Sequence, residues 1–166
     1  MLKLKLQNGD IVRMEHSLKA IADWEALTNK PYFDNTGSKK QGEDIWLYLN
    51  CMLLDDSIEL SEENVGVEEM EQIQAYLEKS QTATTLKTNP DEKKKKRIVT
   101  AEQIYASMIK AGVAKEYEMW NIDRLTTLLG VLADMFEEKK PMTQAEIYEQ
   151  NAKLNAERRK KLNSKG

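Results

Sequence analysis

Helical periodicity, interrupted once, is the feature that most constrains the fold of this chain. Apolar residues recur every three or four positions in three segments before residue 80 and in two segments after residue 99. This spacing places apolar side chains on one face of a helix. Between residues 80 and 97 the periodicity disappears. The pattern predicts a mainly α protein with two small helical parts joined by an exposed linker.

The N-terminus predicts a β-hairpin, which makes the expected class α+β. Leu2, Leu4 and Leu6 alternate with lysines, the period of a half-buried strand, and Asn8-Gly9 favours a tight turn. Two loop lengths are compatible with this turn. A two-residue loop places Arg13 on the apolar face, whereas a three-residue loop that includes Asp10 pairs Leu6 with Val12. We expect the longer loop because it keeps one face of the hairpin apolar.

Cap signals set the expected helix limits. Ser17 is the predicted N-cap of a helix that ends near Leu27, with Leu18, Ile21 and either Trp24 or Ala22 inward. Capping-box patterns at residues 100–103 and 143–146 begin two later helices. The expected apolar stripes of the other helices are Ile45, Tyr48, Leu49, Met52 and Leu53; Met70, Ile73 and Leu77; Ile104 and Met108; and Ile122, Leu125, Leu129, Leu132 and Phe136, widened by Leu128 and Met135.

These signals divide the chain into four segments. Residues 1–79 form the hairpin with the first helical part, and residues 80–99 form the linker. Residues 100–141 form the second helical part, and residues 142–166 form a polar, basic helix or tail. That last segment has too few apolar residues for a core helix, so we expect a surface helix, a frayed end or a partner-binding arm.

The residue types needed for catalysis are scarce. His16 and Cys51 are the single histidine and cysteine, so a Cys/His nucleophile would require these two to meet beside a third, orienting group. A zinc site built from Cys and His needs about four ligands. The chain contains neither a P-loop nor a dinucleotide-binding glycine pattern. We therefore expect no enzyme, no cofactor and no metal, with His16 in a turn and Cys51 beside the core.

Charge is unevenly distributed along a chain whose net charge is −3. Residues 55–78 contain nine acidic residues and no Lys or Arg, whereas residues 87–97 contain six basic and two acidic ones. Residues 151–166 contain six basic residues and one acidic. Both basic clusters could contact phosphates, but no aromatic residues alternate with them for base stacking. The alternative is a solvated linker and a helix C-terminus, which we favour. No apolar run approaches the length of a membrane span, and one cysteine fits a reducing compartment.

Six stretches, in this order, carry a family resemblance: EHSLKAIADWE (15–25), KPYF (30–33), QTAT (81–84), VTAEQIY (99–105), WNIDRLTTLL (120–129) and NAKLNAERR (151–159). Together they resemble the tail assembly chaperones of tailed bacteriophages, which escort the tape-measure protein during tail construction. The resemblance extends over nearly the whole chain, although no single stretch is a chemical fingerprint. It implies a helical adaptor without catalysis or cofactor, with phage tail proteins as partners in the host cytoplasm.

We expect partner-binding residues in two regions. Trp120 precedes the strongest predicted helix and is followed by Arg124, and both residue types are enriched at binding hot spots. The alternative is that Trp120 packs its own helix onto a neighbour. The polar C-terminal segment is the second region, with a frayed tail as its alternative; its candidates are Leu154, Arg158, Arg159 and Leu162.

Three functions follow from these observations. The first is a phage tail assembly chaperone that binds the tape-measure or other tail proteins and is absent from the finished particle. The second is a structural tail or neck component that stays in the virion. The third is a nucleic-acid-binding accessory protein that uses the two basic clusters. Self-association is compatible with each of them.

Overall fold

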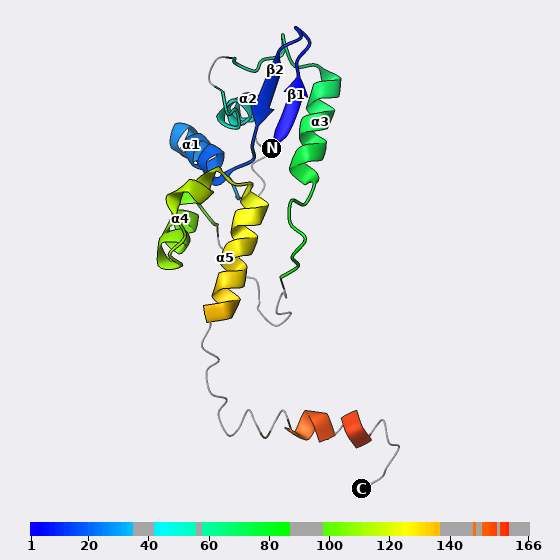
Figure 1. The fold of residues 1–166 in the computed structure, drawn as a ribbon, viewed down its shortest axis with the longest axis vertical. Helices are drawn as coiled ribbons and strands as arrows, with labels where there is room; N and C mark the ends of the chain where they lie inside the picture. Colours follow the sequence, from blue (N-terminus) through cyan, green and yellow to red (C-terminus); the bar gives the residue numbers. More distant parts are fainter. Residues whose placement is uncertain are drawn as a thin grey trace. The chain divides into compact units, whose positions relative to one another are not determined.

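The computed structural model describes residues 1–34, 42–55, 58–86, 98–136, 148, 151–155 and 157–159. Helices dominate, and one two-stranded antiparallel sheet lies at the N-terminus (Figure 1). The predicted mainly α class with an N-terminal hairpin is therefore confirmed. The chain forms two compact units, Met1–Met135 and Phe136–Gly166. In the second unit, residues 151–155 and 157–159 are helical and exposed.

Strands β1 (Leu2–Lys5) and β2 (Ile11–Met14) form the hairpin, but in a register other than the predicted one. Leu2 pairs with Met14 and Leu4 with Val12, a shift of two residues from the expected pairing of Leu6 with Val12. Because side chains alternate with a period of two, this shift leaves the same residues on the apolar face. The alternation therefore identified the buried face, whereas the predicted pairing was wrong.

The turn explains the register. The Leu6 amide donates to the Asp10 carbonyl at 2.8 Å, and the Gly9 amide donates to the Leu6 carbonyl at 2.9 Å. Gln7, Asn8 and Gly9 thus form the three-residue loop, with Gly9 last and in a left-handed conformation, φ 92°. A three-residue hairpin loop commonly ends in such a residue, and glycine adopts this conformation without steric cost.

Helix α1 (Leu18–Thr28) begins as predicted, with the Ser17 side chain accepting a hydrogen bond from the Ala20 amide at 3.2 Å. Trp24, rather than Ala22, is the fully buried residue of its inner face. The Trp24 indole Nε1 donates to the Asp44 carbonyl at 2.9 Å, which fixes α1 against α2 (Gly42–Cys51). In α2 the predicted stripe holds for Tyr48 and Leu49, but Ile45 is exposed.

The hairpin lies between α2 and α3 (Val67–Glu78) in Figure 1, and α3 packs along β1. Beyond α2, the chain pairs with the outer edge of β2, because the Leu54 amide donates to the Arg13 carbonyl at 2.9 Å. Leu53 forms an isolated antiparallel bridge with Met14. The hydrogen-bonding edge of β2 is thereby partly covered.

Helix α4 (Ala101–Lys110) starts after Thr100, but the predicted capping-box hydrogen bond is absent because the Thr100 side chain makes no cap contact. The cap comes from another helix. The buried Glu25 carboxylate of α1 accepts from the Ala101 amide at 2.8 Å through one oxygen, and from the Tyr32 amide at 2.7 Å through the other. A carboxylate at a helix N-terminus satisfies a free amide and complements the helix dipole.

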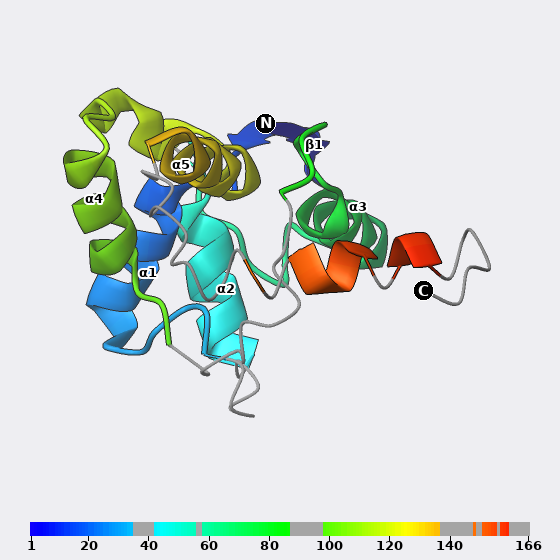
Figure 2. The same cartoon turned by 90° about the horizontal axis from the view of Figure 1, so that it is seen from below.

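The 3-10 helix η1 (Lys115–Met119) leads into α5 (Ile122–Phe136). Figure 2, seen from below, shows α1 between α2 and α4. Ile122 and Leu125 of α5 are buried, and Leu129 packs against the core. The predicted stripe is wrong at its far end, since Phe136 is 72% exposed.

Residues on both sides of the predicted linker contribute to one hydrophobic core. The buried set includes Leu4, Trp24 and Ile73 before it, and Ile104 and Leu125 after it. The helices of the two predicted parts therefore share a core within the first unit. The second capping box, at residues 143–146, lies outside the described residues, as do the basic residues 93–97.

The turn yields a stability prediction. Gly9→Ala should lower the free energy of unfolding by about 1 kcal/mol, because alanine in a left-handed conformation costs about 1–2 kcal/mol. Gly42→Ala is the matched control, since Gly42 begins α2 with no positive φ and no atom within 4 Å of an added Cβ. Urea unfolding of both variants checks this, and an equal effect at the two sites would contradict the turn geometry.

Candidate partner-binding groove

A groove lies between α5 and the segment that follows α3. We call it the α5 groove, and its volume is about 310 Å³. Both polar and apolar residues line it, and residues 81–84 of the predicted linker form one wall. Its lining residues are Gln81, Thr82, Ala83, Thr84, Trp120, Arg124, Thr127, Leu128 and Val131.

Trp120 and Arg124 form an ordered pair within this groove. The Arg124 guanidinium carbon lies 4.5 Å from the centroid of the Trp120 ring, a cation–π arrangement. The centroids of the Tyr117 and Trp120 rings lie 4.4 Å apart. The half-buried indole thus packs on its own chain with one part and lines the groove with another. The stack reduces the number of rotamers open to Arg124 before any partner arrives.

Arg124 is exposed, and no carboxylate within the described part of the chain forms an ion pair with it. The recorded ion pairs join the N-terminal ammonium to Glu15, Lys19 to Asp23, and Lys30 to Asp44. The guanidinium keeps its planar set of N–H donors, a geometry suited to a carboxylate or phosphate.

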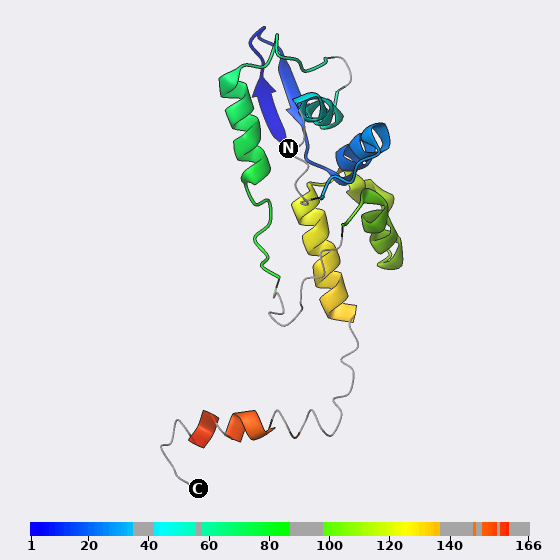
Figure 3. The same cartoon turned by 180° about the vertical axis from the view of Figure 1, so that it is seen from behind.

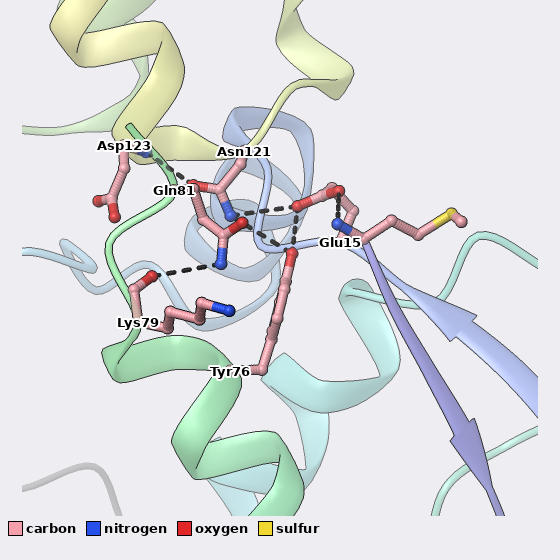
Figure 4. Close-up of polar contacts among 7 residues, drawn as sticks. Glu15, Tyr76, Lys79, Gln81, Asn121 and Asp123 are labelled. Carbon is pink, nitrogen blue, oxygen red and sulfur yellow. Dashed lines mark hydrogen bonds and ion pairs between the residues drawn. The ribbon is translucent and has the colours of Figure 1, made fainter. Parts of the chain in front are cut away.

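Glu15 holds the start of α5 in place. Figure 4 shows its carboxylate accepting hydrogen bonds from the Tyr76 hydroxyl of α3 and from the Asn121 side-chain amide at 3.1 Å. Its other oxygen pairs with the ammonium of Met1 at 2.6 Å. Asn121 also caps α5, because its Oδ1 accepts from the Asp123 amide at 3.0 Å. The residue before the cap is Trp120, so this network fixes the groove's aromatic wall.

Backbone contacts reinforce the same junction. The Ile122 amide donates to the His16 carbonyl at 2.8 Å, and Ser17 forms an isolated antiparallel bridge with Asn121. The start of α5 is therefore joined to the turn between β2 and α1 by main-chain and side-chain bonds together.

The network shifts two pKa values in opposite directions. Burial alone raises the pKa of the Glu15 carboxyl, but hydrogen bonds from the N-terminal ammonium, Tyr76 and Asn121 lower it below its usual value. Burial and the hydrogen bond to Glu15 raise the pKa of Tyr76 to about 12. At neutral pH the arrangement is thus a carboxylate with a neutral phenol donor.

The segment that forms the opposite wall is anchored at its far end. Figure 3 shows the chain after α3 running beside α5. A methyl group placed on Gly130 of α5 would overlap the Leu86 side chain, so glycine permits this close approach. Residues 80–86, predicted as part of an exposed linker, are half-buried at Gln81 and Thr82 and exposed beyond them.

The structure places the predicted site residues in different units. Trp120 and Arg124 share the α5 groove. Leu154, Arg158 and Arg159 belong to the second unit, where Leu154 is 44% exposed and both arginines are exposed. Leu162 lies outside the described residues.

Several groove residues were not predicted as binding residues. Gln81–Thr84 carry part of the family resemblance, but their composition indicated only a linker. Thr127 and Val131 were absent from the apolar stripe, and Leu128 was assigned to the core. Helical periodicity identifies the buried face of α5, yet it carries no information about a loop that returns along another face.

Neither His16 nor Cys51 forms part of this groove. His16 Nδ1 makes a hydrogen bond with the Tyr48 hydroxyl, and burial raises the pKa of the Cys51 thiol, which disfavours a reactive thiolate. Among the described residues, no three His, Cys, Asp or Glu side chains gather as a metal site would require. No described helix has the length and apolar character needed to cross a membrane.

Comparisons with known proteins identified no relative. No protein-family model, curated protein or solved structure matched the chain.

The Glu15 network predicts a pH-dependent contribution to stability. Because folding lowers the pKa of Glu15, its contribution is present above the pKa of the unfolded state and is lost as the pH falls through the folded value. Glu15→Gln should therefore lower the free energy of unfolding by about 1–2 kcal/mol at pH 7. The difference from wild type should shrink below about pH 4.

Urea unfolding between pH 3 and pH 7 measures this contribution. Glu71→Gln, an exposed change in α3, is the matched control and should have little effect throughout. A Glu15→Gln deficit that is constant with pH would show that the ionised carboxylate is not what stabilises the junction.

Because Leu86 contacts α5 at Gly130, we expect the effects of substitutions at these two positions on stability to be coupled. Gly→Ala inside a helix normally stabilises by about 1 kcal/mol, but here the added methyl group meets Leu86. Gly130→Ala should therefore stabilise more in a Leu86→Ala background than in wild type. Thermal or urea unfolding of the four proteins gives the coupling free energy, and a value near zero would mean that the segment does not rest on α5.

Proposed function

We propose that this protein is a non-enzymatic tail assembly chaperone or adaptor of a tailed bacteriophage. It binds the tape-measure protein or another tail protein in the host cytoplasm during morphogenesis and leaves before the particle is complete. The proposal rests on the succession of resembling stretches and on the α5 groove.

The groove is the observation that carries the proposal. Two of the resembling stretches, residues 81–84 and 120–129, are separated by more than thirty residues in sequence, yet both line it. A groove with an aromatic–arginine pair and a partly apolar floor has the character of a protein-binding site, where Trp and Arg side chains dominate affinity. It contains no pair of groups arranged for nucleophilic attack or proton transfer.

A structural virion component is the second candidate, and one observation favours it. Leu154, Arg158 and Arg159 are exposed on helical residues of the second unit. An exposed leucine with two cations is suited to docking on an acidic neighbour, which would retain the chain in the tail or neck. The same arginines would serve a nucleic-acid-binding accessory protein, whose DNA affinity would fall steeply with salt.

Affinity capture from phage-infected cells tests the function. Wild-type protein should recover the tape-measure or another tail protein, and mass spectrometry of purified virions should not detect this chain. Trp120→Ala should reduce the recovery by about tenfold, the loss expected for a hot-spot tryptophan. Ile109→Ala removes an apolar side chain that is 80% exposed on α4 and should leave recovery unchanged.

A fixed copy number of the chain in virions would overturn the chaperone in favour of the structural component. Recovery of nucleic acid without tail proteins, abolished by moderate salt, would instead favour the third hypothesis.

A further inference from the structure

We propose that the α5 groove binds a short extended peptide segment of the partner, in which an aspartate or glutamate contacts Arg124 and a neighbouring apolar residue contacts Leu128 and Val131. The inference specifies the chemistry of the bound segment. It rests on the proposed function only for the identity of the protein that contains this segment.

Charge complementarity argues for the acidic residue. Arg124 is held over the Trp120 ring at 4.5 Å and is exposed, and its side chain pairs with no carboxylate within the described residues. The other groove side chains are uncharged, so nothing in the lining competes for the guanidinium. A carboxylate that approaches through the groove can form two parallel hydrogen bonds with it.

The floor of the groove argues for an apolar neighbour. Leu128 and Val131 are spaced by three residues and therefore lie close together on one side of α5. Both are half-buried and both line the groove, which leaves part of each side chain open to a partner. Arg124 lies one turn before Leu128, so a carboxylate and an apolar side chain can bind about 6 Å apart along α5.

The spacing of the two contact points suits an extended segment. Two side chains of an extended segment that point to the same face are about 6–7 Å apart, close to the separation of about 6 Å between Arg124 and Leu128 along α5. The choice of an extended rather than a helical segment rests on the backbone groups of the opposite wall.

Backbone groups on the opposite wall can hold an extended segment. Within the described residues, no backbone hydrogen bond is recorded for Ala83, which lines the groove and is exposed. The Thr84 amide, in contrast, already donates to the Thr82 side chain at 3.2 Å. The N–H and C=O of Ala83 are thus open to main-chain hydrogen bonds with a peptide, the mode by which extended peptides gain affinity independent of sequence.

A selection with displayed peptides tests this inference. Random twelve-residue peptides displayed on a carrier are selected against the full-length protein, and the recovered sequences are synthesised with capped ends. Dissociation constants are measured by fluorescence anisotropy for wild type, Arg124→Glu and Arg13→Glu. Arg13 is exposed on β2, away from the lining residues, and serves as the matched control.

We expect recovered peptides to share an acidic residue with an apolar residue two positions away. Arg124→Glu should weaken binding at least tenfold, and Arg13→Glu less than twofold. Replacing the peptide's acidic residue by lysine should restore binding to Arg124→Glu but not to wild type. Amide hydrogen exchange of Ala83 should slow when the peptide is bound.

Recovered peptides without an acidic residue, equal effects of the two arginine variants, or failure to recover any peptide would each overturn the inference. Peptides with apolar residues at helical spacing, which leave exchange at Ala83 unchanged, would overturn the extended mode. If acidic peptides bind the groove while no tail protein is captured from infected cells, the proposed function fails and the peptide specificity stands. Capture that persists in Arg124→Glu would locate the tail-protein contact elsewhere.

Discussion

The arrangement of the first unit depends on the buried carboxylate of Glu15. It accepts hydrogen bonds from Tyr76 and Asn121 and pairs with the N-terminal ammonium, so α3, α5 and the start of β1 meet at one side chain. A buried carboxylate is tolerated only when such donors replace its lost hydration. Because those donors come from positions up to 106 residues away, the group constrains tertiary structure rather than any single helix.

Glu25, near the C-terminal end of α1, is a second buried carboxylate whose lost hydration is replaced by hydrogen bonds. Its two oxygens accept one backbone amide each, from Tyr32 and from Ala101 at the start of α4. The cap of α4 is therefore a tertiary contact, and a helix that looked autonomous in sequence is fixed to α1. Through these two carboxylates, helices on both sides of the predicted linker are joined by hydrogen bonds as well as by the shared core.

The α5 groove is a consequence of this construction. The Glu15 junction places Trp120 at the start of α5, and Leu86 packed on Gly130 holds the opposite wall along the same helix. Arg124 is thereby held over an aromatic ring and remains exposed. A preorganised cation beside a partly apolar floor lowers the entropic cost of binding. Under the proposed function, such a site would recognise a partner by shape and charge.

The sequence by itself determined the mainly helical class, the apolar face of the hairpin, the Ser17 cap and the burial of Ile122 and Leu125. These follow from local periodicity and local capping chemistry, which depend on neighbours in the chain. It also singled out Trp120 and Arg124 as residue types suited to binding. The hairpin register was decided by the geometry of the local turn that ends at Gly9, which the alternation of apolar residues does not specify. Only the tertiary structure decided what depends on distant partners: the Glu25 cap of α4 and the return of residues 81–84 along α5. Buried polar bonds and loop packing depend on which distant segments meet, and a local sequence pattern does not contain that information.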